Sequence, residues 1–215
     1  MTPPPPNFDR VARIYRWAEY LSLGPLLVRT RNHFLPQLTQ RRRALLLGDG
    51  DGRFLARLLQ QNPDLHALAV DTSAAMLHLL RERCLRTAPN SHLNILQASA
   101  LHVAPSRDTD LIVTHFFLDC LPQSDVDALT ARIAAEVAPG TLWLLSDFAI
   151  PAAPLLRPLA ALYVRSLYLA FRVLTGLRTT QLPDPQAALT RAGFQRIARH
   201  TRLFGLLYTE LWQRQ

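Results

Sequence analysis

The stretch "ALLLGDGDGRF", residues 44–54, joins a short apolar run to three glycines at every second position. A run of four apolar residues is typical of a buried strand. Glycine has no side chain, so Gly48, Gly50 and Gly52 can turn the chain sharply and let another group approach the backbone closely. The chain has only 8 glycines in 215 residues. Three of them within five positions therefore favour a binding turn after a strand over a plain tight turn, which remains the simpler alternative.

From Arg43 onward, short apolar runs alternate with helical patterns. We expect strands at 44–47, 66–70, 93–97, 110–114 and 141–146, and helices at 53–60, 73–86 and 124–137. This alternation requires right-handed crossovers, and it predicts a doubly wound α/β domain whose mostly parallel sheet is covered on both faces. Two further strands, 194–202 and 204–212, are expected to complete a seven-stranded sheet as an antiparallel C-terminal hairpin.

Two helical regions lie outside this alternation. Residues 8–38 predict two short helices with a break at Gly24-Pro25. Residues 151–178 predict one or two long helices, whose four arginines, at 157, 165, 172 and 178, fall on one side. An ordinary surface helix is the simplest interpretation. A helix that lines a lipophilic pocket or contacts a membrane surface remains open.

Charge and composition exclude few classes of protein. The formal net charge is +8 and the pI about 10.6, but all 24 basic residues are arginine, which indicates a compositional bias. We interpret Arg41-Arg42-Arg43 as the solvated beginning of a strand. The two cysteines, Cys84 and Cys120, fit a reducing compartment and lack metal-ligand spacing. With no long apolar run and no apolar leader, a cytoplasmic protein without a metal is expected.

A carboxylate follows the second expected strand, at Asp71. In an open α/β sheet, ligands bind beyond the carboxyl ends of the strands, where the glycine turn also lies. A carboxylate there can accept hydrogen bonds from both hydroxyls of a ribose. The spacing alone therefore predicts a nucleoside-cofactor site, with the alternative that Asp71 only caps the helix that begins near Ser73.

The glycine spacing, G-x-G-x-G, differs from the G-x-G-x-x-G of dinucleotide-binding folds. It is followed in order by "LAVDTSAAML" (68–77), "ILQASAL" (95–101), "TDLIVTHFFLDCLP" (109–122), "VAPGTLWLLSDF" (137–148) and "ALTRAGFQRIARHT" (188–201). This ordered set resembles the class I S-adenosylmethionine-dependent methyltransferases over about residues 40 to 215. The segment "FDRVARIYRWAEYLSLG" (8–24) is more loosely similar to the quinone-biosynthesis methyltransferase branch.

The resemblance implies S-adenosyl-L-methionine as the cofactor. It divides the single methyltransferase domain into an N-terminal helical lid (1–40), a cofactor-binding core (41–150), a helical insertion near the substrate pocket (151–180) and C-terminal strands (181–215). One departure is Leu46, which stands where the family usually has an acidic residue, so that Asp49 or Asp51 is expected to take over part of its role. The implied cofactor contacts are Gly48, Asp49, Gly50 and Gly52 at the methionine part, Asp71 at the ribose, Thr72, Met76, Ser99 and Ala100 around the adenine, His115 after the fourth strand, and Tyr15 in the lid.

The activity that the resemblance implies is transfer of a methyl group by in-line displacement, in which the protein orients the reactants and excludes water. His115 is the first candidate for a general base and Asp119 the second, although a core histidine and a turn-capping or solvated aspartate are the simpler interpretations. Cys120 is not expected to be a nucleophile.

The expected acceptor is a small, lipophilic or aromatic organic molecule. The fourth motif lacks the Asn/Asp-Pro-Pro-aromatic element of enzymes that methylate amino groups of bases, and Phe116 and Phe117 stand there instead. Nucleic acid is therefore not the expected partner. Two alternatives remain: an RNA methyltransferase, on account of the charge, and a non-catalytic cofactor-binding protein, on account of Leu46 and Ser99. Oligomeric state and acceptor atom are left open.

Overall fold

The structure is a computed structural model that describes residues 23–151, 153, 157–175 and 182–215. Seven strands form one sheet in the order β3-β2-β1-β4-β5-β7-β6. Neighbouring strands among the first five are parallel, whereas β7 is antiparallel to both β5 and β6. The predicted doubly wound sheet with an antiparallel hairpin is confirmed. The strands are β1 Arg43–Leu47, β2 His66–Asp71, β3 His92–Gln97, β4 Leu111–His115, β5 Leu142–Phe148, β6 Phe194–Arg202 and β7 Leu207–Arg214.

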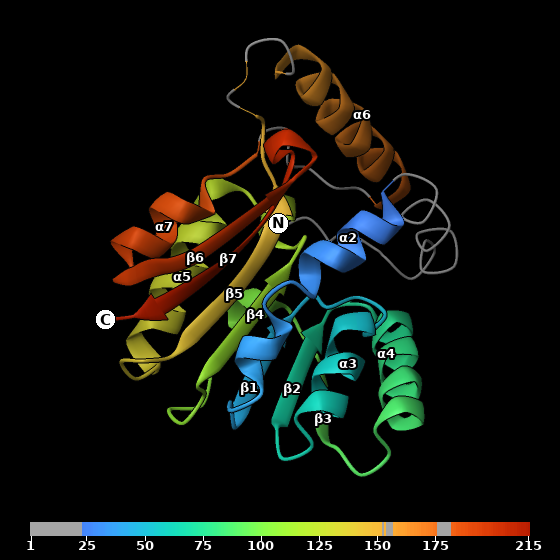
Figure 1. Ribbon diagram of the computed structural model, residues 1–215, viewed down its shortest axis with the longest axis vertical. Coiled ribbons are helices and arrows are strands. Elements are labelled where there is room, and N and C mark those ends of the chain that lie inside the picture. Colours follow the sequence, from blue (N-terminus) through green and yellow to red (C-terminus); the bar gives the residue numbers. More distant parts are fainter. Residues whose placement is uncertain (1–22, 152, 154–156, 176–181) are drawn as a thin grey trace, which may run out of the picture.

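Helices cover both faces of this sheet (Figure 1). Alternate strand residues point to opposite faces, so Leu46 and Val113 join one apolar cluster while Leu45 and Ile112 join the other. The first cluster includes residues of α3 and α4, and the second includes residues of α5 and α7. The described helices are α2 Gly24–Arg31, α3 Arg53–Gln61, α4 Ala74–Thr87, α5 Gln123–Glu136, α6 Arg157–Thr175 and α7 Pro185–Arg191.

The C-terminal part differs from the sequence-based prediction at two points. Helix α7 was not predicted. It is short, and Asp184 caps it by accepting a hydrogen bond from the Ala187 N–H at 2.9 Å. Strand β7 begins at Leu207 rather than at Phe204, because Leu203–Gly205 form a 3-10 turn in which Phe204 has a φ of 55°.

The predicted break at Gly24-Pro25 is the first turn of α2, where proline needs no hydrogen-bond partner for its nitrogen. The helix expected before this point, and Tyr15 with it, lie outside the described residues. Residues 157–175, for which a long helix was predicted, form α6.

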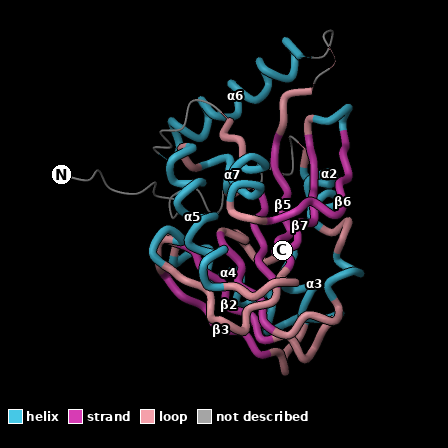
Figure 2. Tube along the Cα trace, turned by 90° about the vertical axis from the view of Figure 1, so that its left-hand side faces the viewer, coloured by secondary structure: helices cyan, strands magenta, loops and turns pink. Residues whose placement is uncertain are grey.

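Helix α6 lies beyond the end of the sheet at which β5 finishes (Figures 1 and 2). Its Val164 packs with Cys120, which follows β4, and with Leu206, which precedes β7. One side of the helix is thereby held over the carboxyl ends of the parallel strands. None of the helices in the described ranges has the length and apolar character needed to cross a membrane.

Candidate functional site

The glycine turn after β1 has a left-handed backbone at all three glycines, with φ values of 67°, 62° and 75° at Gly48, Gly50 and Gly52. The Gly48 N–H donates to the Val70 carbonyl at 3.0 Å, so the turn starts directly from the pairing of β1 with β2. A Cβ on Gly52 would lie 2.9 Å from the Leu80 Cα, whereas a Cβ on Gly50 would meet nothing within 4 Å. Gly52 therefore permits close packing of α3 on α4, and Gly50 faces open space.

This contrast predicts unequal costs of substitution. Gly52→Val combines a backbone clash with a left-handed conformation that β-branched residues resist, and we expect it to lower the free energy of unfolding by about 3 kcal/mol or more. Gly50→Ala meets only the conformational cost, about 1 kcal/mol. Urea unfolding of the two variants measures the difference, and equal losses would contradict this account of the turn.

Asp71 ends β2 beside the glycine turn. Its Oδ1 accepts a hydrogen bond from the Ser73 N–H at 2.9 Å, and its side chain is half-buried. The cap of α4 is Ser73, whose Oγ accepts from the Met76 N–H at 3.2 Å. The alternative in which Asp71 serves as the cap of this helix is therefore wrong.

The predicted cofactor contacts gather along one edge of the sheet. Leu47 of β1 is in register with Val70 of β2 and Thr114 of β4. The residues that come directly after these three, Gly48, Asp71 and His115, therefore lie at the same level of adjacent strands. Neighbouring strands are about 4.8 Å apart, which places these three residues within roughly 10 Å across the sheet. Around them, Thr72 is exposed, Met76 is buried in the first turn of α4, Ser99 is half-buried after β3, and Ala100 is buried.

Two arginines that the sequence analysis missed hold parts of this edge. Arg132 of α5 donates to the carbonyl oxygens of Ala100, at 2.8 Å, and Leu101, which fixes the turn after β3. Arg31 of α2 is buried, and its guanidinium lies 5.0 Å from the centre of the Phe116 ring. No spacing in the sequence connects either arginine to the motifs, because the fold alone brings them there.

The two aspartates of the glycine turn have different surroundings. Asp51 is tied to α3 and α4, since its Oδ2 accepts from Arg53 at 3.0 Å and from Arg83 at 2.9 Å. The Asp49 Oδ2 accepts from the Leu55 N–H at 3.3 Å. Burial raises the pKa of Asp49 to about 7, although the nearby Arg31 acts in the opposite direction. Asp49 is thus the acid of the turn that remains available for a cationic group.

Asp49 also predicts a pH dependence of stability. The pKa of Asp49 is about 7 in the folded protein and near 4 in an unfolded chain. Folding is therefore accompanied by proton uptake between about pH 4 and pH 7. This contribution to the free energy of unfolding is present below pH 4 and is lost as the pH rises to 7. We expect the wild type to lose at least about 1 kcal/mol relative to Asp49→Asn between pH 5 and pH 8. Parallel urea profiles for the two proteins would contradict this assignment.

His115, at the end of β4, is 3% exposed and packs edge-on against Phe54 of α3, with ring centres 4.4 Å apart. Neither ring nitrogen has a hydrogen-bond partner among the residues that the structure describes. Burial, and next the positive charge of Arg31, lower the pKa of His115 well below 6.5. It is therefore a neutral imidazole near pH 7, and its nitrogens are not satisfied as those of an ordinary core histidine would be.

Asp119 forms a pair with Asp147, a residue that the sequence analysis did not select. Asp119 lies in the 3-10 turn Leu118–Cys120 after β4, and its N–H donates to the Asp147 Oδ2 at 3.1 Å. Asp119 is 6% exposed and Asp147 1%, so the interpretation of Asp119 as a solvated turn residue is wrong. The position of Asp147 near the carboxyl end of a strand is the sequence feature that could have identified it.

Burial sets the protonation of this pair. It raises the pKa of Asp119 to about 6, and, together with the neighbouring charge of Asp119, it raises the pKa of Asp147 well above the usual range. Burial therefore disfavours the charged form of both carboxyl groups. The Cys120 thiol donates to the Asp119 Oδ1 at 3.5 Å, and burial raises the pKa of this thiol well above its usual range.

Aromatic side chains flank the same edge. Phe116 has a left-handed φ of 52°, a strained conformation of the kind that concentrates at functional sites, and its ring lies 5.1 Å from that of Phe148. Phe117 lies against Gly48, where a Cβ on the glycine would collide with its ring. Apolar side chains therefore lie next to the glycine turn.

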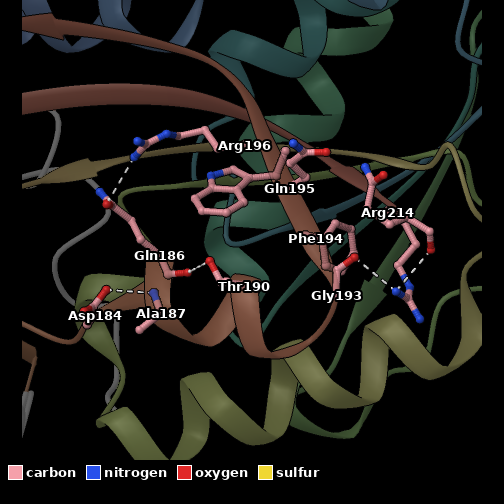
Figure 3. Close-up of a pocket in the computed structure, with 11 residues that line it drawn as sticks. Asp184, Gln186, Ala187, Thr190, Gly193, Phe194, Gln195, Arg196 and Arg214 are labelled. Carbon is pink, nitrogen blue, oxygen red and sulfur yellow. Dashed lines mark hydrogen bonds between the residues drawn. The ribbon is translucent and has the colours of Figure 1, made fainter.

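A separate hollow of about 680 Å³ lies between α7 and the β6–β7 hairpin (Figure 3). Its two arginines are already engaged. Arg214 donates to the Gly193 carbonyl at 3.1 Å, and Arg196 donates to Glu210 at 3.0 Å. Of the predicted site residues that the structure describes, none lines this hollow, which is thus distinct from the carboxyl edge.

Comparison with known proteins finds similarity over part of the chain. Residues 45–142 match a family model described as a methyltransferase domain. The carboxy-S-adenosyl-L-methionine synthase of Dichelobacter nodosus is 34% identical over 92 residues, which are 43% of this chain and 38% of that protein.

Solved structures share the fold over nearly the whole chain. The mitomycin 7-O-methyltransferase has a TM-score of 0.69 at 20% identity, covering 97% of this chain and 61% of its own. An O-methyltransferase family 2 protein from Planctomyces limnophilus, solved with apigenin, has a TM-score of 0.70 at 19% identity, with 96% and 62% covered. The magnesium protoporphyrin IX methyltransferase of Synechocystis PCC 6803, solved with bound S-adenosylhomocysteine, has a TM-score of 0.70 at 12% identity, with 97% and 96% covered. The chain spans less than two thirds of the length of the first two of these enzymes and of the Dichelobacter protein.

Proposed function

We propose that the chain is a class I S-adenosylmethionine-dependent methyltransferase, which transfers the methyl group of S-adenosylmethionine to a small lipophilic or aromatic acceptor. The observation that carries the proposal is the edge at which the left-handed glycine turn, Asp71 and the phenylalanines meet.

The cofactor residues divide according to the chemistry of S-adenosylmethionine. In the proposal, Gly50, which faces open space, leaves room for its methionine part, and the Asp49 carboxylate attracts the ammonium group. Asp71 accepts hydrogen bonds from the ribose hydroxyls. Leu46, at the position of the family's usual acid, is completely buried in the core and cannot make this contact. Asp49 takes over that role.

The acceptor side is proposed to lie over the ends of β4 and β5. Apolar walls from Phe116, Phe117 and Phe148 favour a lipophilic or aromatic molecule and exclude water from the reacting atoms. The comparisons include O-methyltransferases of the same fold, one of them solved with apigenin. An acceptor hydroxyl must lose its proton during transfer, and His115 and Asp119 are the proposed bases.

Transfer itself is an in-line displacement. The sulfonium carries its own activation, so the protein contributes by holding the acceptor atom, the methyl carbon and the sulfur in line. The acceptor forms a bond to the methyl carbon as the carbon–sulfur bond breaks, and the electron pair of that bond returns to sulfur. The acceptor proton passes to the base.

A methyl-transfer assay tests the proposal. Purified protein is incubated with methyl-labelled S-adenosylmethionine and a panel of hydroxylated aromatic compounds, with total RNA in a parallel reaction. Label is expected in the organic extract and not in the RNA. Label in RNA alone would replace the proposed acceptor class with nucleic acid.

A non-catalytic cofactor-binding role is the second candidate, favoured by the replacement of the family's acid by Leu46. It predicts binding of S-adenosylhomocysteine without transfer to any acceptor of the panel. RNA receives less support, because the Arg43 side chain already pairs with Asp108.

A further inference from the structure

Large apolar side chains are exposed at the end of the molecule where β5 finishes. Leu159 and Leu162 on α6 are each 66% exposed, and Phe204, in the connection between β6 and β7, is 83% exposed. Figures 1 and 2 place α6 and this connection at the same end of the molecule. The two segments are in contact, because Leu206 packs with Val164 of α6. The exposed apolar side chains therefore lie on two segments that contact each other.

Phe204 is exposed although its backbone conformation is energetically unfavourable. Its φ is 55° and that of Leu203 is 49°, in the left-handed region that bulky residues avoid. Strained residues persist where the surroundings hold them, and they cluster at functional positions. A side chain that is 83% exposed buries little surface on folding, so its aromatic character does not serve the core.

The charges beside these side chains indicate what covers them. Arg157 and Arg165 are exposed on α6, and residues 157–175 contain no acidic residue. The whole chain carries a net charge of +8. Apolar side chains interspersed with arginines, on a helix without carboxylates, are typical of helices that lie in the interface of an anionic membrane.

We propose that α6 and the β6–β7 connection form a docking surface for an anionic lipid bilayer. Leu159, Leu162 and Phe204 enter the boundary between headgroups and acyl chains, while Arg157 and Arg165 contact lipid phosphates. This surface goes beyond the proposed methyl transfer, and its function as a docking site does not require that transfer.

Vesicle sedimentation of the full chain tests the surface. Vesicles of phosphatidylcholine alone are compared with vesicles that contain about one third phosphatidylglycerol. We expect partitioning into the anionic vesicles to be at least about tenfold stronger, and to fall at high salt. The double variant Leu159→Ser/Leu162→Ser should weaken partitioning by at least about tenfold. Each leucine side chain gains free energy when it moves from water into the bilayer, and serine lacks this gain.

Two further variants separate docking from folding. Phe204→Gly should weaken partitioning several-fold without lowering the Tm, because glycine accepts the left-handed backbone. Leu85→Ser, at a 46% exposed leucine on α4, is the matched control and should partition like the wild type. Equal partitioning of all variants, or no preference of the wild type for anionic vesicles, would overturn the proposal. Binding of the protein to RNA, under conditions in which it does not bind anionic vesicles, would also overturn the proposal. S-adenosylhomocysteine binding by the same variants reports separately on the cofactor site.

Discussion

Replacing Asp71 with alanine is expected to weaken the binding of S-adenosylhomocysteine by at least about a hundredfold. Asp71 stands at the end of β2, beside the left-handed glycine turn, where its carboxylate can accept hydrogen bonds from both ribose hydroxyls. Hydrogen bonds to a charged group contribute about 1.5–3 kcal/mol each, and every 1.4 kcal/mol corresponds to about tenfold in affinity. Isothermal titration calorimetry measures the loss directly.

Two variants control this measurement. Asp71→Asn retains one side-chain oxygen for the Ser73 N–H, which is bound at 2.9 Å in the wild type, so local structure is kept while one acceptor for the ribose is lost. It should fall between the wild type and Asp71→Ala. Asp64→Ala changes an exposed aspartate at the opposite end of β2 and should bind like the wild type. Unchanged affinity of Asp71→Ala for S-adenosylhomocysteine would show that Asp71 does not bind the ribose.

The second large effect is expected at the proposed base. His115→Ala should lower turnover with a hydroxylated acceptor by about 10²–10⁴-fold, the usual contribution of a general base, while affinity for S-adenosylhomocysteine changes by no more than a few-fold. The wild-type imidazole is buried and neutral, so it can receive a proton without first losing one. Initial-rate assays at saturating cofactor measure the effect.

Three controls identify which group acts. His115→Gln fills most of the volume beside Phe54, and a low rate in this variant too would exclude a packing defect as the cause. His102→Ala, at an exposed histidine after β3, should leave turnover unchanged. If Asp119→Asn loses turnover while the His115 variants retain it, the base is Asp119. The wild-type rate should then rise with pH through about 6, as the Asp119 carboxylate forms.

The core of the fold could be predicted because its sequence patterns are local. Four apolar residues followed by glycines identify β1 and its turn, and β6 begins and ends where the alternation of its residues indicates. The end of the hairpin could not be predicted in the same way. Phe204 continues an apolar pattern, but the chain turns there through left-handed residues, so β7 begins three residues later.

The site was predictable only on the side where motifs lie along the chain. Glycines and Asp71 follow successive strands, so the topology places them together. The contacts of Arg31, Arg132 and Asp147 depend on tertiary packing. Asp147, in β5, contacts Asp119, which follows the neighbouring strand β4. Arg132 reaches the turn after β3 from α5. Spacing carries no information about such contacts.

The most direct test of the central claim is a calorimetric titration of the wild-type protein with S-adenosylhomocysteine, beside an identical titration with NAD. The G-x-G-x-G turn with Asp71 predicts micromolar binding of S-adenosylhomocysteine at one site per chain and no heat of binding with NAD. Binding of NAD without S-adenosylhomocysteine, or of neither compound, would contradict the assignment of this edge as a methyltransferase cofactor site.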